Sequence, residues 1–91
     1  MRHITFTSGD ATPTVANANL CDTAGTTTIT DFDNGIVGQI IYILANDSIT
    51  ITDGTPIILN GSADYTMTVT DTLTLCMFND QAWSEIARSV N

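Results

Sequence analysis

Apolar and polar residues alternate along much of the chain, which is the pattern of β-strands with one buried face. From residue 65 to residue 77 the odd positions are apolar except Asp71, while the even positions between 66 and 74 are all threonine. This period of two predicts a half-buried strand pair, with an interruption or turn at residues 70–72. Residues 48–52 repeat the pattern on a smaller scale, and a last strand is expected at residues 81–89.

The segment 36–44 differs because it is apolar at both odd and even positions. A strand of this kind is expected to be covered on both faces. In so short a chain the second cover is expected to be another subunit. Gly35 and Gly38, at the start of this segment, are assigned to backbone conformations that a Cβ would strain.

Composition supports an all-β fold for the whole chain. Seventeen of the 91 residues are threonine and isoleucine is the commonest apolar residue, and both are β-branched residues that favour strands. Turn-forming pairs such as Asn46-Asp47, Asp53-Gly54 and Asn60-Gly61 punctuate the sequence at short intervals. Residues 9–25 have few large apolar side chains, so residues 1–20 are expected to form an N-terminal arm or extended lead-in and residues 21–91 a single β-domain.

The charge of the chain excludes several classes of partner. Ten acidic residues against two arginines and no lysine give a net charge of −8. Nucleic acids and anionic membranes are bound by basic surfaces, which this composition cannot build. We therefore expect neither nucleic acid nor membrane as a partner, and no apolar run approaches the ~20 residues of a membrane-spanning helix.

Candidate chemistry is sparse, and we expect no catalytic residues, no metal ligands and no cofactor. His3 has no orienting partner in the sequence. Residues 31–35 superficially resemble a calcium loop, but Tyr42 stands where an EF-hand would place its bidentate glutamate, so a turn is expected and an oxygen-only cation site stays open. Cys21 and Cys76 are expected to be reduced thiols, with a single disulfide as the alternative.

Several segments together resemble a known family. They are "TPTV" at residues 12–15, "TTITDFDNGIVGQII" at 27–41 and "WSEIARS" at 83–89. Their order is similar to that in C-terminal β-modules of phage tail-fibre and tail-spike proteins and related virion proteins, over about residues 12–90. The resemblance implies homotrimers whose strands wrap a common axis, with a structural or adhesive role and no catalysis.

The resulting hypothesis is an all-β, small β-sandwich or β-helix-like module that forms an intertwined or axis-packed homotrimer. It would be a non-enzymatic bacteriophage virion protein, made in the host cytoplasm, that contacts other capsid or tail proteins in a tail fibre or spike or as a capsid decoration. The residues expected in the core or at the subunit interface are Ile29, Phe32, Ile41, Ile43, Ile49, Ile51, Ile58, Val69, Leu73, Leu75 and Trp83.

Three alternatives remain. In a carbohydrate-binding module, Trp83 or Tyr65 would stack on a host glycan. A depolymerising tail-spike enzyme would need paired carboxylates, which the sequence does not gather. The repeated Thr-x-Thr pairs could order water as in ice-binding solenoids, but their intervals are irregular.

Overall fold

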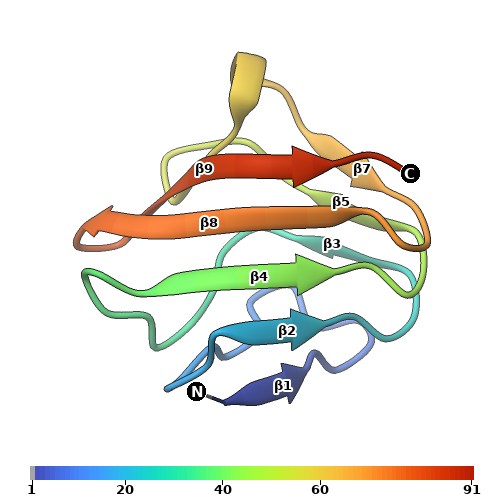
Figure 1. Cartoon of the computed structure of the whole chain (residues 1–91), viewed down its shortest axis with the longest axis horizontal. Helices are drawn as coiled ribbons and strands as arrows, with labels where there is room; N and C mark the ends of the chain where they lie inside the picture. The colour runs from blue at the N-terminus through green and yellow to red at the C-terminus, as the bar shows by residue number, and fades with distance from the viewer. Residues whose placement is uncertain (1) are drawn as a thin grey trace.

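The computed structural model describes residues 2–91, which form two β-sheets packed face to face (Figure 1). The larger sheet has the strand order β1 (His3–Thr5), β2 (Leu20–Asp22), β4 (Ile40–Leu44), β8 (Thr72–Asn79), β9 (Ala82–Ser89) and β6 (Ile57–Ile58). The smaller sheet has the order β3 (Thr27–Ile29), β5 (Ile49–Ile51) and β7 (Tyr65–Met67), and a short 3₁₀ helix, η1, covers Asn60–Ser62. The all-β prediction is confirmed, and the architecture is a sandwich rather than a β-helix.

The core lies between the two sheets, where the alternation of each strand points its apolar side chains inward. In β4, Ile41 and Ile43 are buried while their neighbours are exposed. Full burial of a side chain of this size contributes roughly 1.5–3 kcal/mol. Nine of the eleven residues predicted for the core or interface are buried here: Ile29, Phe32, Ile41, Ile43, Ile49, Ile51, Leu73, Leu75 and Trp83.

Ile58 and Val69 do not belong to this core, so for these two residues only the interface part of the prediction stays. Ile58 is exposed because its neighbour Ile57 takes the inward position of β6. Val69 is exposed because it lies in the connection between β7 and β8.

The strands predicted as a pair within residues 65–77 are not paired with each other. β7 pairs with β5 in the smaller sheet, whereas β8 lies between β4 and β9 in the larger sheet. The connection crosses from one sheet to the other, and Thr70 takes a left-handed backbone conformation there, with φ of 75°. Both strands face the same core from opposite sides, which is why the odd positions stay apolar across the crossing.

Residues 2–20 form part of the sandwich and not a separate arm. β1 pairs with β2, and β2 itself begins at Leu20, so the expected boundary cuts through a strand. Val15 is fully buried, and its N–H donates to the carbonyl of Asp33 at 2.9 Å. Phe6 and Ala18 are buried in the same core, so three apolar side chains and a few backbone hydrogen bonds fix a segment that has few large apolar residues.

The two glycines of the β3–β4 connection are required for different reasons. Gly38 has φ of +93°, a conformation that strains any residue with a Cβ, as predicted. Gly35 is not left-handed; a Cβ there would collide with the Cζ2 atom of Trp83. Its role is close packing of the backbone against the core.

Candidate functional site

The outer face of the larger sheet carries half-exposed apolar side chains on β2, β4 and β6, whereas the outward positions of β8 include Thr72 and Thr74. Leu20 pairs with Tyr42, and across β8 and β9 the row that contains Ile40 continues through Cys76 and Ser84 to Ile58. We call this surface the apolar outer face and define it by Leu20, Ile40, Tyr42, Leu44 and Ile58. Their exposed fractions run from 38% to 50% in the single chain. The cover predicted for the second face of β4 is therefore not supplied by this chain.

Charge is confined to one edge of this face. Asp22 on β2 lies 2.6 Å from the Oγ1 of Thr5, which donates a hydrogen bond to it, and 3.0 Å from the Nε2 of His3. Asn46 donates a third contact at 3.0 Å. These contacts, with the Thr5 hydrogen bond as the largest cause, hold the pKa of Asp22 below its ordinary value. The strands β4, β8 and β6 add no charged side chain to the face.

Trp83 does not offer a ring to a glycan, contrary to the carbohydrate-binding prediction. Its side chain is fully buried, with its ring edge-on to Phe32 at a centroid distance of 5.8 Å. It is a core residue that fills the space beside Gly35.

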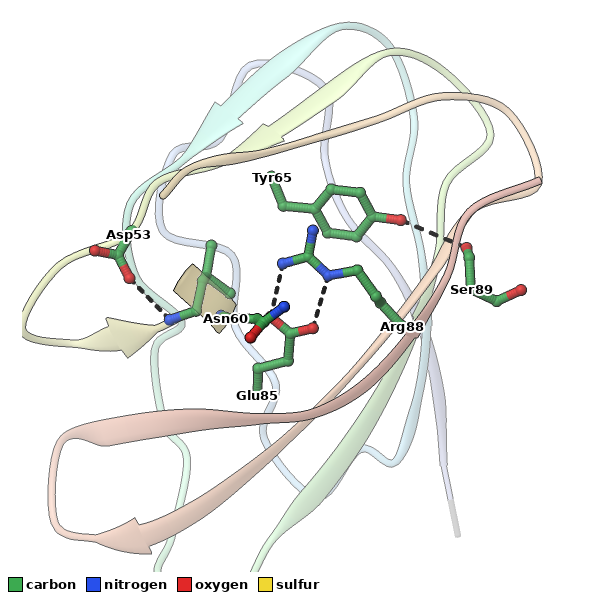
Figure 2. Close-up of polar contacts among 7 residues, drawn as sticks. Asp53, Asn60, Tyr65, Glu85, Arg88 and Ser89 are labelled. Carbon is green, nitrogen blue, oxygen red and sulfur yellow. Dashed lines mark hydrogen bonds and ion pairs between the residues drawn. The ribbon is translucent and has the colours of Figure 1, made fainter. Parts of the chain in front are cut away.

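Tyr65 is also unavailable for stacking on a sugar. Its ring is 4% exposed because the guanidinium of Arg88 covers it, with Cζ 3.8 Å from the ring centroid (Figure 2). The hydroxyl of Tyr65 donates to the backbone carbonyl of Ser89 at 3.4 Å. Burial is the main reason that the pKa of Tyr65 is raised.

Arg88, which joins the two sheets by covering the ring of Tyr65, also forms an ion pair within β9 that the sequence analysis missed. Its Nε and Nη2 atoms donate to the two oxygens of Glu85, each at 2.7 Å, and Glu85 also accepts from the N–H of Asn60 at 2.8 Å (Figure 2). The Arg88 hydrogen bonds lower the pKa of Glu85, and the same pairing raises the pKa of Arg88. Both oxygens of Glu85 and two of the three guanidinium nitrogens of Arg88 are engaged inside the chain, so we assign the cluster to stability and not to ligand binding.

The Glu85–Arg88 pair is hidden in the sequence by a β-bulge. Residues three apart on a regular strand point to opposite faces. In β9, however, Glu85 pairs with Leu75 and Ala87 with Thr74, so Ile86 is an extra residue that restores Arg88 to the inner side. The spacing Glu-x-x-Arg therefore predicts an ion pair only if the position of the bulge is known.

The cysteines and the acidic residues show no further site. Cys21 is buried on the inner side of β2, and Cys76 lies on the outer side of β8; both are free. Burial is the main cause that raises the pKa of Cys21 to about 12. Within residues 2–91 no three His, Cys, Asp or Glu side chains gather as metal ligands, including those of the loop at 31–35, and no helix there is long and apolar enough to cross a membrane.

The fold is thus that of a small β-sandwich module with one apolar outer face. The chain belongs to the family of the phage depolymerase C-terminal beta sandwich domain, whose model matches residues 3–84. This confirms the resemblance to C-terminal modules of phage tail-spike proteins, and the match includes the first twenty residues except the first two. No curated protein and no solved structure matches the chain.

Proposed function

We propose that this chain is a non-enzymatic structural module of a phage particle that self-associates as a homotrimer through the apolar outer face. Family membership supports the phage origin and the tail-spike setting. The observation that carries the self-association is the row of half-exposed apolar side chains on β2, β4 and β6. We propose three copies rather than two because the modules that the chain resembles are homotrimers whose strands wrap a common axis.

The charge distribution favours a second copy of the chain as the occupant of this face. Two molecules of net charge −8 repel each other over most of their surfaces. The apolar outer face is where they can meet without bringing carboxylates together, because its acidic residue, Asp22, lies toward the β1 edge and contacts His3.

The size of the face also suits an interface. Six strands spaced about 4.8 Å apart span roughly 24 Å, and the eight-residue strands β8 and β9 extend about 26 Å. Because β1, β2 and β6 have only two or three residues each, the sheet fills part of this rectangle of about 600 Å² and would supply part of the ~800 Å² that each partner contributes to a standard interface.

The same reasoning bears on where the protein acts. The family description favours a tail-spike position over the capsid-decoration role, with other tail proteins as further partners. The module would be made in the host cytoplasm and function in the virion. No catalytic role is proposed, because the clustered acid Glu85 is committed to Arg88.

The test is the solution mass of the wild type, Tyr42→Glu and Thr66→Glu by light scattering, in buffer and in mild denaturant. Tyr42 lies on the apolar outer face and Thr66 on the exposed side of the smaller sheet, so both variants add one charge at an exposed strand position. We expect a trimer for the wild type and Thr66→Glu, and a folded monomer for Tyr42→Glu. A monomeric wild type, or a trimeric Tyr42→Glu, would overturn the proposal.

A further inference from the structure

Three pairs of residues in the chain place a side-chain amide or carboxylate directly before a glycine. They are Asn34-Gly35, Asp53-Gly54 and Asn60-Gly61. Glycine has no side chain to shield its own nitrogen, so this nitrogen can reach the side-chain carbonyl carbon of the preceding residue and close a cyclic imide. The preceding side chain must first fold back over the peptide bond that follows it. The structure determines which of the three pairs has that freedom.

The pair Asn34-Gly35 is held in place on both sides. The Nδ2 atom of Asn34 donates to the Oγ1 atom of Thr14 at 2.8 Å, and Thr14 is itself fixed by a β-bridge to Asp33. Gly35 packs so closely against Trp83 that a Cβ there would collide with the ring. Ring closure here requires the loop to open first, so its rate is reduced by the small population of open molecules.

The pair Asp53-Gly54 is held by two hydrogen bonds. The carboxylate of Asp53 accepts from the N–H of Leu59 at 2.8 Å. The N–H of Gly54, whose nitrogen would have to attack, donates to the carbonyl of Ile57 at 2.8 Å. Both reacting groups are therefore committed to other partners, and this pair also has to open before it can react.

The pair Asn60-Gly61 differs because its side chain faces open space. Both residues are exposed, and a Cβ on Gly61 would meet no atom within 4 Å. Asn60 is held by its backbone N–H, which donates to the carboxylate of Glu85 at 2.8 Å, and Figure 2 shows the two residues side by side. Within residues 2–91 its side-chain amide has no hydrogen-bond partner, so it is free to fold back over Gly61.

The backbone around Asn60 is also weakly held. Residues 60–64 are all exposed and lie between the buried side chains of Leu59 and Tyr65. The 3₁₀ helix η1 is a single turn, and Gly61 and Ser62 within it have left-handed φ of 73° and 53°. Short turns with few buried contacts belong to the least stable parts of a structure, so little free energy is needed to move this one.

We propose that Asn60 is a site of spontaneous deamidation and that its product loosens η1 from β9. The nitrogen of Gly61 loses its proton to solvent and attacks the Cγ atom of Asn60. The new N–Cγ bond forms, the Cγ–Nδ2 bond breaks, and Nδ2 leaves as ammonia. Water then opens the cyclic imide at either of its carbonyls and gives aspartate or isoaspartate. Water is the only co-reactant, and nothing is oxidised or reduced.

The product disturbs the contact between η1 and β9. Deamidation adds one negative charge beside the carboxylate of Glu85, in a chain whose net charge is already −8, and the two like charges repel. Isoaspartate also inserts one extra carbon into the main chain, so the single turn of η1 cannot keep its geometry. Because η1 connects β6 of the larger sheet to β7 of the smaller sheet, its loosening lowers stability while the strands keep their pairing.

The test compares deamidation at Asn34 and Asn60 in the native protein and in guanidinium chloride, during incubation in mildly alkaline buffer. Peptic digestion and mass spectrometry measure each site. In the unfolded chain the two rates should be similar, because both asparagines precede glycine. In the native protein Asn60 should react at close to its unfolded rate, whereas Asn34 should be slowed by at least about tenfold. Every reacting atom comes from one chain, so the proposal does not rest on self-association.

The matched control for the effect on stability is Asn60→Gln. It keeps an exposed amide and the backbone N–H that donates to Glu85, but its longer side chain closes an imide ring much more slowly. After equal incubation, the guanidinium chloride midpoint should fall in the wild type and stay unchanged in Asn60→Gln. The proposal is overturned if native Asn34 reacts as fast as Asn60, if native Asn60 is slowed as strongly as Asn34, or if incubation changes both midpoints equally or neither.

Discussion

The two sheets of the sandwich differ in the apolar content of their outer faces. On the smaller sheet, Thr28, Thr50 and Thr66 pair in register across β3, β5 and β7. On the larger sheet the corresponding outward positions of β4 are Ile40, Tyr42 and Leu44. The inner faces of both sheets are apolar, so the alternation of residues is the same and only the outward residues differ.

This difference indicates which outer face meets water. Threonines opposite each other pack and hydrogen-bond across strands while remaining polar, which suits a solvated face and discourages edge aggregation. Exposed apolar side chains gathered on one sheet are typical of an interaction surface, which is the basis of the proposed self-association. The composition of an outer face is therefore a better guide to assembly than the hydrophobicity of the whole chain.

The largest effect is expected from two substitutions on one strand, Ile43→Asp and Tyr42→Asp. Ile43 is 1% exposed, so an aspartate there is an unpaired charge in the core and costs more than about 4 kcal/mol. Tyr42 points outward, and aspartate there should leave the fold intact while preventing assembly. Urea unfolding followed by circular dichroism separates the two. A folded, assembled Ile43→Asp variant would contradict this placement.

The next largest loss of stability is expected when the contact between Arg88 and Tyr65, which joins the two sheets, is changed. Arg88→Met keeps the length of the side chain over Tyr65 but leaves Glu85, which is 7% exposed, without its partner. We expect a loss of about 3 kcal/mol in the free energy of unfolding. Arg88→Met/Glu85→Gln should recover part of this loss, because the uncompensated charge is removed. If the double variant is no more stable than the single one, the ion pair does not have this role.

Lowering the pH is expected to reduce the stability of the fold by a smaller amount. The lowered pKa values of Asp22, Asp71 and Glu85 mean that the folded state binds their protons less strongly than the unfolded state does. Their contribution to stability is complete above the unfolded values of about 4 and is lost as the pH falls through the folded values. The urea midpoint should therefore fall below pH 4, and less steeply in Glu85→Gln. Identical pH profiles for the two proteins would argue against this contribution of Glu85.

The local parts of this fold could be predicted from the sequence, because a strand's alternation depends only on neighbouring residues. The strand at 49–51 follows from that pattern, whereas the strand at 82–89 contains a bulge and does not alternate regularly. The sheet that each strand joins is a long-range property, so β7 and β8 were wrongly paired. The Glu85–Arg88 contact depends on a bulge that no local pattern signals.

A hollow of about 450 Å³, lined by residues 16–19, Asn34 and residues 36–39, could not be predicted for a similar reason. Its amides come from two segments that are about twenty residues apart, and only the parallel pairing of β2 with β4 brings them together. Asn34 and Gly38 were visible as turn residues, but Asn17 fell in a stretch interpreted as an arm. The alternative function expected a glycan contact at Trp83 or Tyr65, but both side chains are buried in the structure.

The contrast between the outer faces can be sharpened by Thr28→Val/Thr50→Val/Thr66→Val. Valine matches threonine in shape and favours strands, so the fold should change in stability by less than about 1 kcal/mol. The variant should gain a second, concentration-dependent association through the smaller sheet, visible as masses above the trimer in sedimentation velocity. Tyr42→Glu in the same background should retain only this new association. Unchanged sedimentation would mean that an apolar outer face alone does not drive assembly.

The last prediction concerns the reactivity of the two cysteines, which lie on opposite sides of the larger sheet. It involves no change in stability. Cys76 lies half-buried on the outer side, whereas Cys21 is 3% exposed on the inner side and burial raises its pKa to about 12. Iodoacetamide should therefore modify Cys76 faster than Cys21 by on the order of 100-fold or more, because the thiolate is the reactive form. Peptide mass spectrometry measures both sites. In the proposed trimer Cys76 should be protected and Tyr42→Glu should restore its reactivity, because that substitution uncovers the face without disturbing the core.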